Sequence, residues 1–234
     1  MVHSSLKQMG YVVGGAGTVV RALLDVLGPN GTLVMPAETP QVSDPRDWND
    51  ARVDPAWHET IREHLPVFDP RTTPTTMGAI PEAFRTFPET KRSNHPLVSV
   101  CANGRLANDV VSEHALEFCE GRCTPFEKLY EHDGYTLLLG VGFNRCTSLH
   151  YAESLVPQRR TTTHRYPWMV HGQRTWVESP NMANDDGVHF PVVGEQFVAT
   201  NAVQAGRVGT AESSFFSTRE LVDFASSYFA RELT

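Results

Sequence analysis

The sequence predicts an α/β protein with a mixed central sheet flanked by helices. From Gly14 to Leu27 apolar residues recur at helical spacing, and Gly28-Pro29 then ends the helix. A short apolar strand follows directly, from Gly31 to Pro36. A second apolar strand is predicted from Tyr135 to Gly142. This alternation of helix and strand is typical of a layered α/β domain.

The rest of the chain is divided into short elements. The stretch over 37–75 is rich in Pro, Asp, Arg and Trp and is expected to be irregular, apart from a short helix over 57–65. The other predicted helices cover residues 80–87, 105–117, 126–131, the centre of 190–205, and 217–229, where Ser217 and Glu220 form a capping box. Strands are predicted over 98–102 and 206–211, and a hairpin over 160–177 that turns at Gly172.

Length and composition bound the class of protein. The chain has 234 residues, of which 40% are hydrophobic and 20% charged, so we expect one globular domain over residues 1–234. No apolar run approaches the roughly 18 to 20 residues of a membrane span, and the N-terminal residues lack the order of a signal peptide. A cytoplasmic protein without membrane contact is expected, as a monomer or a homodimer.

Charge and cysteine spacing exclude further classes. A net charge of −7 argues against nucleic acid as a partner and suits a cationic small molecule, although acidity also favours solubility. The four cysteines contain no Cys-x-x-Cys pair, and no His-x-x-x-His completes the i, i+4 spacing of Cys119 and Cys123. We therefore predict no metal site.

The segment from Thr147 to Glu153 is the first candidate site. It places two hydroxyls (Thr147 and Ser148), His150 and Glu153 just beyond the carboxyl end of a predicted strand, where α/β sheets usually bind ligands. Histidine moves protons near neutral pH, and a carboxylate three residues away on one helical face can raise its pKa or fix its tautomer. The alternative is a His-Glu pair on a helix surface.

The second candidate is a phosphate cradle at the N-terminus. The hydroxyls of Ser4 and Ser5 precede a helix that Gly14 and Gly15 open, and helix N-termini attract anions. A capped helix without a ligand would have the same sequence.

Two weaker signals remain. His95 lies between Asn94 and Pro96 at a strand start, and it is either a ligand contact or a structural histidine. The stretch over 175–206 is acidic and has no Lys or Arg, which suits an ammonium-rich substrate or a solvated loop. Its candidate substrate-binding residues are Glu178, Asp185 and Asp186.

In order along the chain, several segments together resemble the aminoglycoside 3-N-acetyltransferase family. Among them are Val-His-Ser-Ser-Leu at Val2–Leu6, Gly-Thr-Leu-Val-Met-Pro at Gly31–Pro36, and Arg-Ser-x-His-Pro at Arg92–Pro96. Gly-Val-Gly at Gly140–Gly142 and Thr-Ser-Leu-His-x-Ala-Glu at Thr147–Glu153 follow. The resemblance runs from about residue 2 to the end.

The resemblance implies direct acetyl transfer from acetyl-coenzyme A to the 3-amino group of a 2-deoxystreptamine aminoglycoside, which causes antibiotic resistance. His150 would be the general base, and backbone N–H groups or Thr147 would stabilise the oxyanion. Glu153 is the carboxylate nearest in sequence to orient His150, and Glu178, Asp185 or Asp186 could also reach it through folding. The residues that the resemblance assigns to the coenzyme are Ser4, Ser5, Leu6, Val12, Val13, Gly14, Gly15, Ser93, His95 and Thr124. A histidine-dependent hydrolase is disfavoured, since no Gly-x-Ser-x-Gly elbow is present.

The chain also departs from the family pattern. The family usually has a helix and the front half of a strand before Val2, so the N-terminal helix and part of the first strand are expected to be missing. Where the family has a His-Asp pair, this chain has Phe143-Asn144, followed by Arg145, whose charge a cationic aminoglycoside would not favour. Alternatives are a non-aminoglycoside amine acceptor or a coenzyme-binding protein without catalysis.

Overall fold

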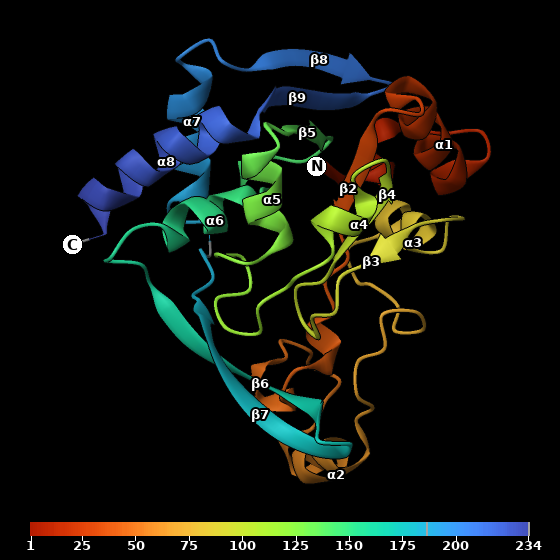
Figure 1. The fold of residues 1–234 in the computed structure, drawn as a ribbon, viewed down its shortest axis with the longest axis vertical. Helices are drawn as coiled ribbons and strands as arrows, with labels where there is room; N and C mark the ends of the chain where they lie inside the picture. The colour runs from red at the N-terminus through yellow and green to blue at the C-terminus, as the bar shows by residue number, and fades with distance from the viewer. Residues whose placement is uncertain (186, 234) are drawn as a thin grey trace.

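The computed structural model describes residues 1–185 and 187–233. Its largest sheet has the strand order β1-β5-β9-β8 (Figure 1). β1 (Val2–Ser4) pairs parallel with β5 (Tyr135–Leu139), and β9 (Ala211–Ser217) pairs antiparallel with both β5 and β8 (Gln204–Val208). The predicted mixed sheet is therefore confirmed.

A second, antiparallel sheet continues this layer. β4 (Val100–Gly104) lies between β2 (Thr32–Pro36) and β3 (Lys91–Arg92). β2 also contacts β1, so the two sheets meet where the chain first crosses the molecule. This contact brings the carboxyl ends of β1 and β2 close to each other.

Helices cover both sheets. α1 (Gly15–Leu27) packs against α3 (Ala79–Arg85) beside the smaller sheet. On the other side lie α4 (Ala107–Val110), α5 (Pro125–Glu131), α6 (Ser148–Ser154), α7 (Phe190–Val198) and α8 (Thr218–Glu232).

α8 carries the largest helical contribution to the core. Leu221, Ala225 and Phe229 are spaced by four residues and are fully buried, so one apolar face of this helix packs inward. α8 packs against α6, and the predicted cap is present, since Ser217 Oγ accepts a hydrogen bond from the Glu220 amide. The long helix thus supports the short one that carries His150.

A long hairpin extends away from the sheets (Figure 1). β6 (Thr161–Val170) and β7 (Gln173–Met182) are joined by His171 and Gly172, both of which have positive φ as a two-residue hairpin turn requires. The hairpin lies beside α2 (His58–His64), and the Arg174 guanidinium donates to the carbonyl oxygens of Arg62 and Leu65. The irregular segment over 37–75 is thereby tied to the body.

Three sequence predictions need correction. The helix predicted over 105–117 is only α4, because the chain turns away after Val110 to bring His114 into a buried bond with Ser93. The helix predicted within 190–205 ends at Val198. The strand predicted over 206–211 is instead the end of β8 and the start of β9, and most of β9 was not predicted because its Glu-Ser-Ser segment reads as polar.

No described helix is long and apolar enough to cross a membrane.

Candidate active site

A cavity of about 850 Å³ opens where the two sheets meet the N-termini of α6 and α7. The carboxyl ends of β1 and β2 supply His3, Ser4 and Pro36 to its wall, and the segment after β5 supplies Val141. Ligand sites of α/β proteins usually lie at this end of the strands, and the volume is within the range of small-molecule pockets.

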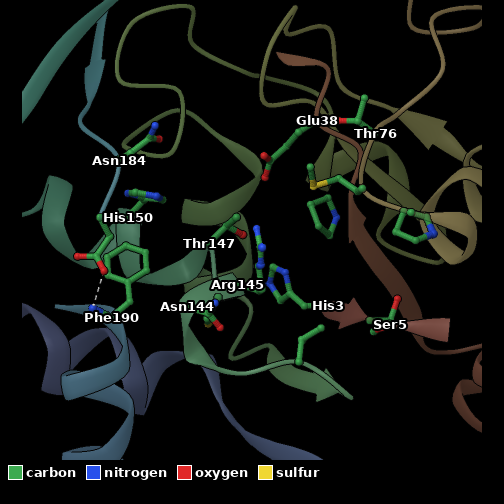
Figure 2. Close-up of a pocket in the computed structure, with 18 of the residues that line it drawn as sticks. His3, Ser5, Glu38, Thr76, Asn144, Arg145, Thr147, His150, Asn184 and Phe190 are labelled. Atoms are coloured by element: carbon green, nitrogen blue, oxygen red, sulfur yellow. Dashed lines mark hydrogen bonds between the residues drawn. The ribbon is translucent and has the colours of Figure 1, made fainter. Parts of the chain in front are cut away.

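His150 lies on this wall, in the first turn of α6 (Figure 2). Its ring packs edge-on against Phe190 with centroids 4.7 Å apart, and its Nδ1 stands 3.8 Å from Glu153 Oε2. Burial acts to lower the pKa of His150, but the carboxylates of Glu153, Glu120 and Glu38 outweigh it, so the pKa is raised. His150 therefore holds its proton to a higher pH than an ordinary histidine does.

Glu153 is fully buried and is fixed by Arg160. The Arg160 Nε and Nη2 atoms donate to its two oxygens at 2.8 and 3.0 Å, and the Arg160 amide adds a bond at 3.2 Å. Burial alone would raise the pKa of Glu153, but its contacts with His150 and Arg160 hold it below the ordinary value. Glu153 stays ionised and is the carboxylate nearest to His150 in the described chain.

Several polar atoms on the cavity wall have no hydrogen-bond partner in the part of the chain that the structure describes. They are His3 Nε2, Ser4 Oγ and Thr147 Oγ1. Buried polar atoms are almost always bonded in proteins, because an unmade bond costs about 1–3 kcal/mol. Their gathering on one wall indicates that a polar ligand completes them.

The residues predicted to bind coenzyme are divided by the structure. Ser4 and Ser5 line the cavity. Leu6 starts the 3₁₀ turn Leu6–Met9 and packs on the core, and the Val12–Gly15 segment lies at the exposed N-terminus of α1; neither contributes to the cavity wall. They remain predictions for the part of a coenzyme that extends outside the cavity.

Ser93 and His95 are not on the cavity. Ser93 Oγ is bonded to His114 Nδ1 and accepts from the Val100 amide, and His95 Nδ1 accepts from the Val98 amide at 2.9 Å. His95 is stacked on His114, and burial holds the pKa of His95 well below its ordinary value. Both side chains are internal structural groups, so the structural alternative for His95 is the one that the geometry supports.

Thr124 is likewise away from the cavity. It precedes α5, it is buried, and its Oγ1 donates to the Gly121 carbonyl at 2.6 Å. The Thr124 hydroxyl proton is thus used by the backbone, and the side chain is buried away from the cavity.

The acidic residues predicted to bind substrate also separate. Glu178 lies on the exposed side of β7, where it pairs with Arg165, and it does not reach the cavity. Asp185 lines the cavity, but its oxygens accept from the amides of His189 and Phe190 at the start of α7, and Arg160 lies 3.4 Å away. Asp186 lies outside the described residues.

Two charged residues of the wall were missed as binding residues. Glu38 follows β2 directly, at the same sheet end that identified His150. Burial, reinforced by Glu120, raises the pKa of Glu38 to about 7, although His150 and Arg145 act against this. Arg145 ends the turn after β5; its charge is evident from the sequence, but its place on the cavity wall is not.

The four cysteines are free, and Cys146 is buried behind the wall. Within residues 1–185 and 187–233, no group of three or more His, Cys, Asp or Glu side chains is arranged to hold a metal ion.

Comparison with known proteins places the chain among acetyltransferases. The family model described as aminoglycoside 3-N-acetyltransferase matches residues 1–230. The aminoglycoside N(3')-acetyltransferase-like protein YokD of Bacillus subtilis is 41% identical over 98% of this chain and 85% of its own length. The crystal structure of YokD superimposes with a TM-score of 0.93, covering 99% of this chain and 86% of that one.

Two solved structures contain ligands. AAC-IIIb, as a binary complex with CoASH, is 29% identical with a TM-score of 0.84 over 97% of this chain and 88% of that one. AAC-VIa bound to sisomicin is 29% identical with a TM-score of 0.85 over 97% of this chain and 89% of that one. The chain therefore belongs to the aminoglycoside 3-N-acetyltransferase family and is an acyltransferase.

Proposed function

We propose that the protein transfers the acetyl group of acetyl-coenzyme A directly to an amine, with His150 as the general base. The observation that supports this most strongly is the pairing of His150 with an ionised, arginine-held Glu153 on the wall of one large cavity. The resemblance to a structure that holds CoASH supports the coenzyme.

The proton transfer follows from the orientation of the ring. Nδ1 of His150 faces Glu153, so the tautomer with hydrogen on Nδ1 is stabilised and the lone pair of Nε2 is available. An ammonium is not a nucleophile, so the acceptor first loses one proton to solvent, and Nε2 of His150 then takes a second proton as the neutral amine nitrogen bonds to the acyl carbon. His150 can then return this proton to the departing thiolate as the carbon–sulfur bond breaks, and the base is regenerated.

The residues of the wall fit the coenzyme. When bound, acetyl-coenzyme A supplies the thioester carbonyl. Ser4 and Ser5 would hold the arm that leads to it, and the unpartnered Thr147 hydroxyl would donate to the oxygen on which negative charge develops. The coenzyme would extend out of the cavity toward α1, and the backbone amides near Gly14 and Gly15 would bind its phosphates.

The first acceptor class is the aminoglycosides, with transfer to the 3-amino group of 2-deoxystreptamine and antibiotic resistance as the result. It is supported by the names of the relatives and by the neighbour that binds sisomicin. A second class, amines that are not aminoglycosides, is favoured by Arg145 on the cavity wall.

The experiment is a panel of acceptors with thiol release from acetyl-coenzyme A as the readout. Turnover with gentamicin-type or apramycin-type antibiotics supports the first class, and turnover only with other amines supports the second. Coenzyme binding without turnover of any amine would overturn the proposed transfer and leave a binding protein without catalysis.

A further inference from the structure

Arg145 presents a charge to the cavity, and the residues that the structure describes supply no partner for it. In Figure 2 its side chain lies between Thr147 and His3 and extends toward Glu38. Among the residues that the structure describes, no carboxylate oxygen lies within 4.0 Å of the guanidinium and no hydrogen bond is made by it. The guanidinium therefore has all its donors available to a ligand.

The backbone that carries Arg145 is firmly held. Phe143, two residues earlier, is stacked on Phe216 with centroids 5.2 Å apart, and it packs so closely on Gly194 that a Cβ there would come within 2.3 Å of its ring. Cys146, the next residue, is completely buried, and its amide is bonded to the Phe143 carbonyl. Arg145 is thus fixed at the cavity between two packed neighbours.

The carboxylates of the cavity leave this charge uncompensated. Glu153 and Asp185 are both bound by Arg160, and Asp185 also accepts the first amides of α7. Glu38 has its pKa raised to about 7, so it carries only part of a negative charge at neutral pH. Among the described residues of the wall, a polycationic acceptor would therefore meet the full positive charge of Arg145, an Asp185 that is already bonded, and Glu38 as the carboxylate without an arginine partner.

We propose that Arg145 binds an anionic group on the acceptor, so the substrate is an amine that also carries a carboxylate, phosphate or phosphonate. Arginine pairs with such groups through two parallel charge-assisted hydrogen bonds. The amine of the same molecule reaches His150, which lines the same cavity. This inference rests on the proposed transfer and names its acceptor class.

The test uses acceptors of equal chain length that differ only in the far group: a diamine, an amino alcohol, an amino carboxylate and an aminoalkyl phosphonate. Wild type should favour the anionic amines by about 10-fold or more in kcat/KM, with the difference in KM, as one charge-assisted pair predicts. Comparing kcat/KM for the amino carboxylate and the aminoalkyl phosphonate then identifies which anionic group the site binds better. Arg145→Gln should abolish this preference, Arg145→Glu should reverse it toward the diamine, and Arg145→Lys should retain part of it.

A matched control is Arg207→Gln, since Arg207 is exposed on β8, pairs with Glu212 and lies away from the cavity wall. It should leave the preference unchanged. Equal kcat/KM for all four amines in wild type, or an Arg145→Gln variant with the wild-type preference, would overturn the proposal. The proposal would also be overturned if Arg145→Gln weakened coenzyme binding and affected all four acceptors equally, since Arg145 would then bind the coenzyme.

Failure of the transfer itself is distinguished by a binding measurement. If no amine is acetylated, calorimetric titration of the aminoalkyl phosphonate and the amino carboxylate into the coenzyme-loaded wild type and Arg145→Gln still decides the point. Binding of either acid that weakens about 10-fold in the variant supports the role of Arg145. Equal binding of both acids to the two proteins, or no binding to either, contradicts it.

Discussion

His150 and Glu153 act as one unit because Arg160 holds the carboxylate. Without Arg160, the fully buried Glu153 would be more easily protonated, and its influence on His150 would be lost. Unlike a surface His-Glu pair, this pair is completed by a third residue that the chain brings back from beyond α6. The charge that acts on His150 is therefore set by a residue that is not among those lining the cavity.

Substituting Glu153→Gln should lower the pKa of the base. A general base works when it is neutral, so kcat/KM rises with pH through the pKa of His150, which Glu153 raises. Removing the charge should move the rising limb of the profile to lower pH. The pH dependence of kcat/KM checks this, with circular dichroism to verify folding. If the rising limb of the kcat/KM profile stays at the wild-type pH in a folded Glu153→Gln variant, Glu153 does not raise the pKa of His150.

Among the elements, the hairpin β6–β7 and the segment over 37–75 depend on one buried carboxylate. Asp44 is fully buried, accepts from the guanidinium groups of Arg62 and Arg165, and has its pKa held far below the ordinary value by its arginine partners despite burial. The Asp44 amide is bonded to the Arg165 carbonyl as well. The hairpin is tied to the segment that leads from Glu38, so this contact also supports the cavity wall.

We expect Asp44→Asn to lower the free energy of unfolding by about 2 kcal/mol. This is below the roughly 3–5 kcal/mol for a fully buried pair, because Arg165 is about a third exposed. Urea unfolding measures the change. The control is Asp50→Asn, whose pair with Arg52 is on the surface and should contribute nothing measurable. Equal effects of the two substitutions would show that the Asp44 cluster carries no special stability.

For the whole molecule, burial of neutral histidines sets the dependence of stability on pH. Burial lowers the pKa of His3 to about 3 and of His114 to about 4, and that of His95 is also well below its ordinary value. In the unfolded chain these groups titrate near 6.5. Between the folded and unfolded values only the unfolded state gains protons, so the fold is destabilised as the pH falls below about 6.5.

Unfolding free energies at pH 7.5, 6.5 and 5.5 test this. Stability should fall by about 0.4 kcal/mol for each buried neutral histidine between pH 7.5 and 6.5, and by about 1 kcal/mol for each between pH 6.5 and 5.5. The raised pKa values of His150 and Glu38 work in the opposite sense and reduce the total. A stability that is constant from pH 7.5 to 5.5 would contradict the neutral, buried state of these histidines.

How much could be predicted from sequence follows from the range of each interaction. The helix over 15–27 and the strand over 32–36 were predictable from local periodicity, and His150 from its place after a strand. Ser93 and His95 look the same locally as ligand contacts, but His114 and Tyr166, which pack against them, come from farther along the chain.

The strand β9 shows the same limit. It lies between β5 and β8 in the sheet, yet its sequence is polar, and pairing on both sides stabilises it. Like His150, Glu38 lies just beyond the carboxyl end of a strand, where α/β sheets usually bind ligands. It could have been found by inspecting the residues after every predicted strand.

The role of His150 as base is tested most directly by kcat for thiol release in His150→Ala beside His64→Ala, which removes an exposed histidine of α2. With the acceptor saturating and coenzyme affinity checked separately, His150→Ala should lower kcat by at least about 100-fold, while His64→Ala should match wild type. A His150→Ala variant that keeps near-normal kcat would contradict the proposed mechanism.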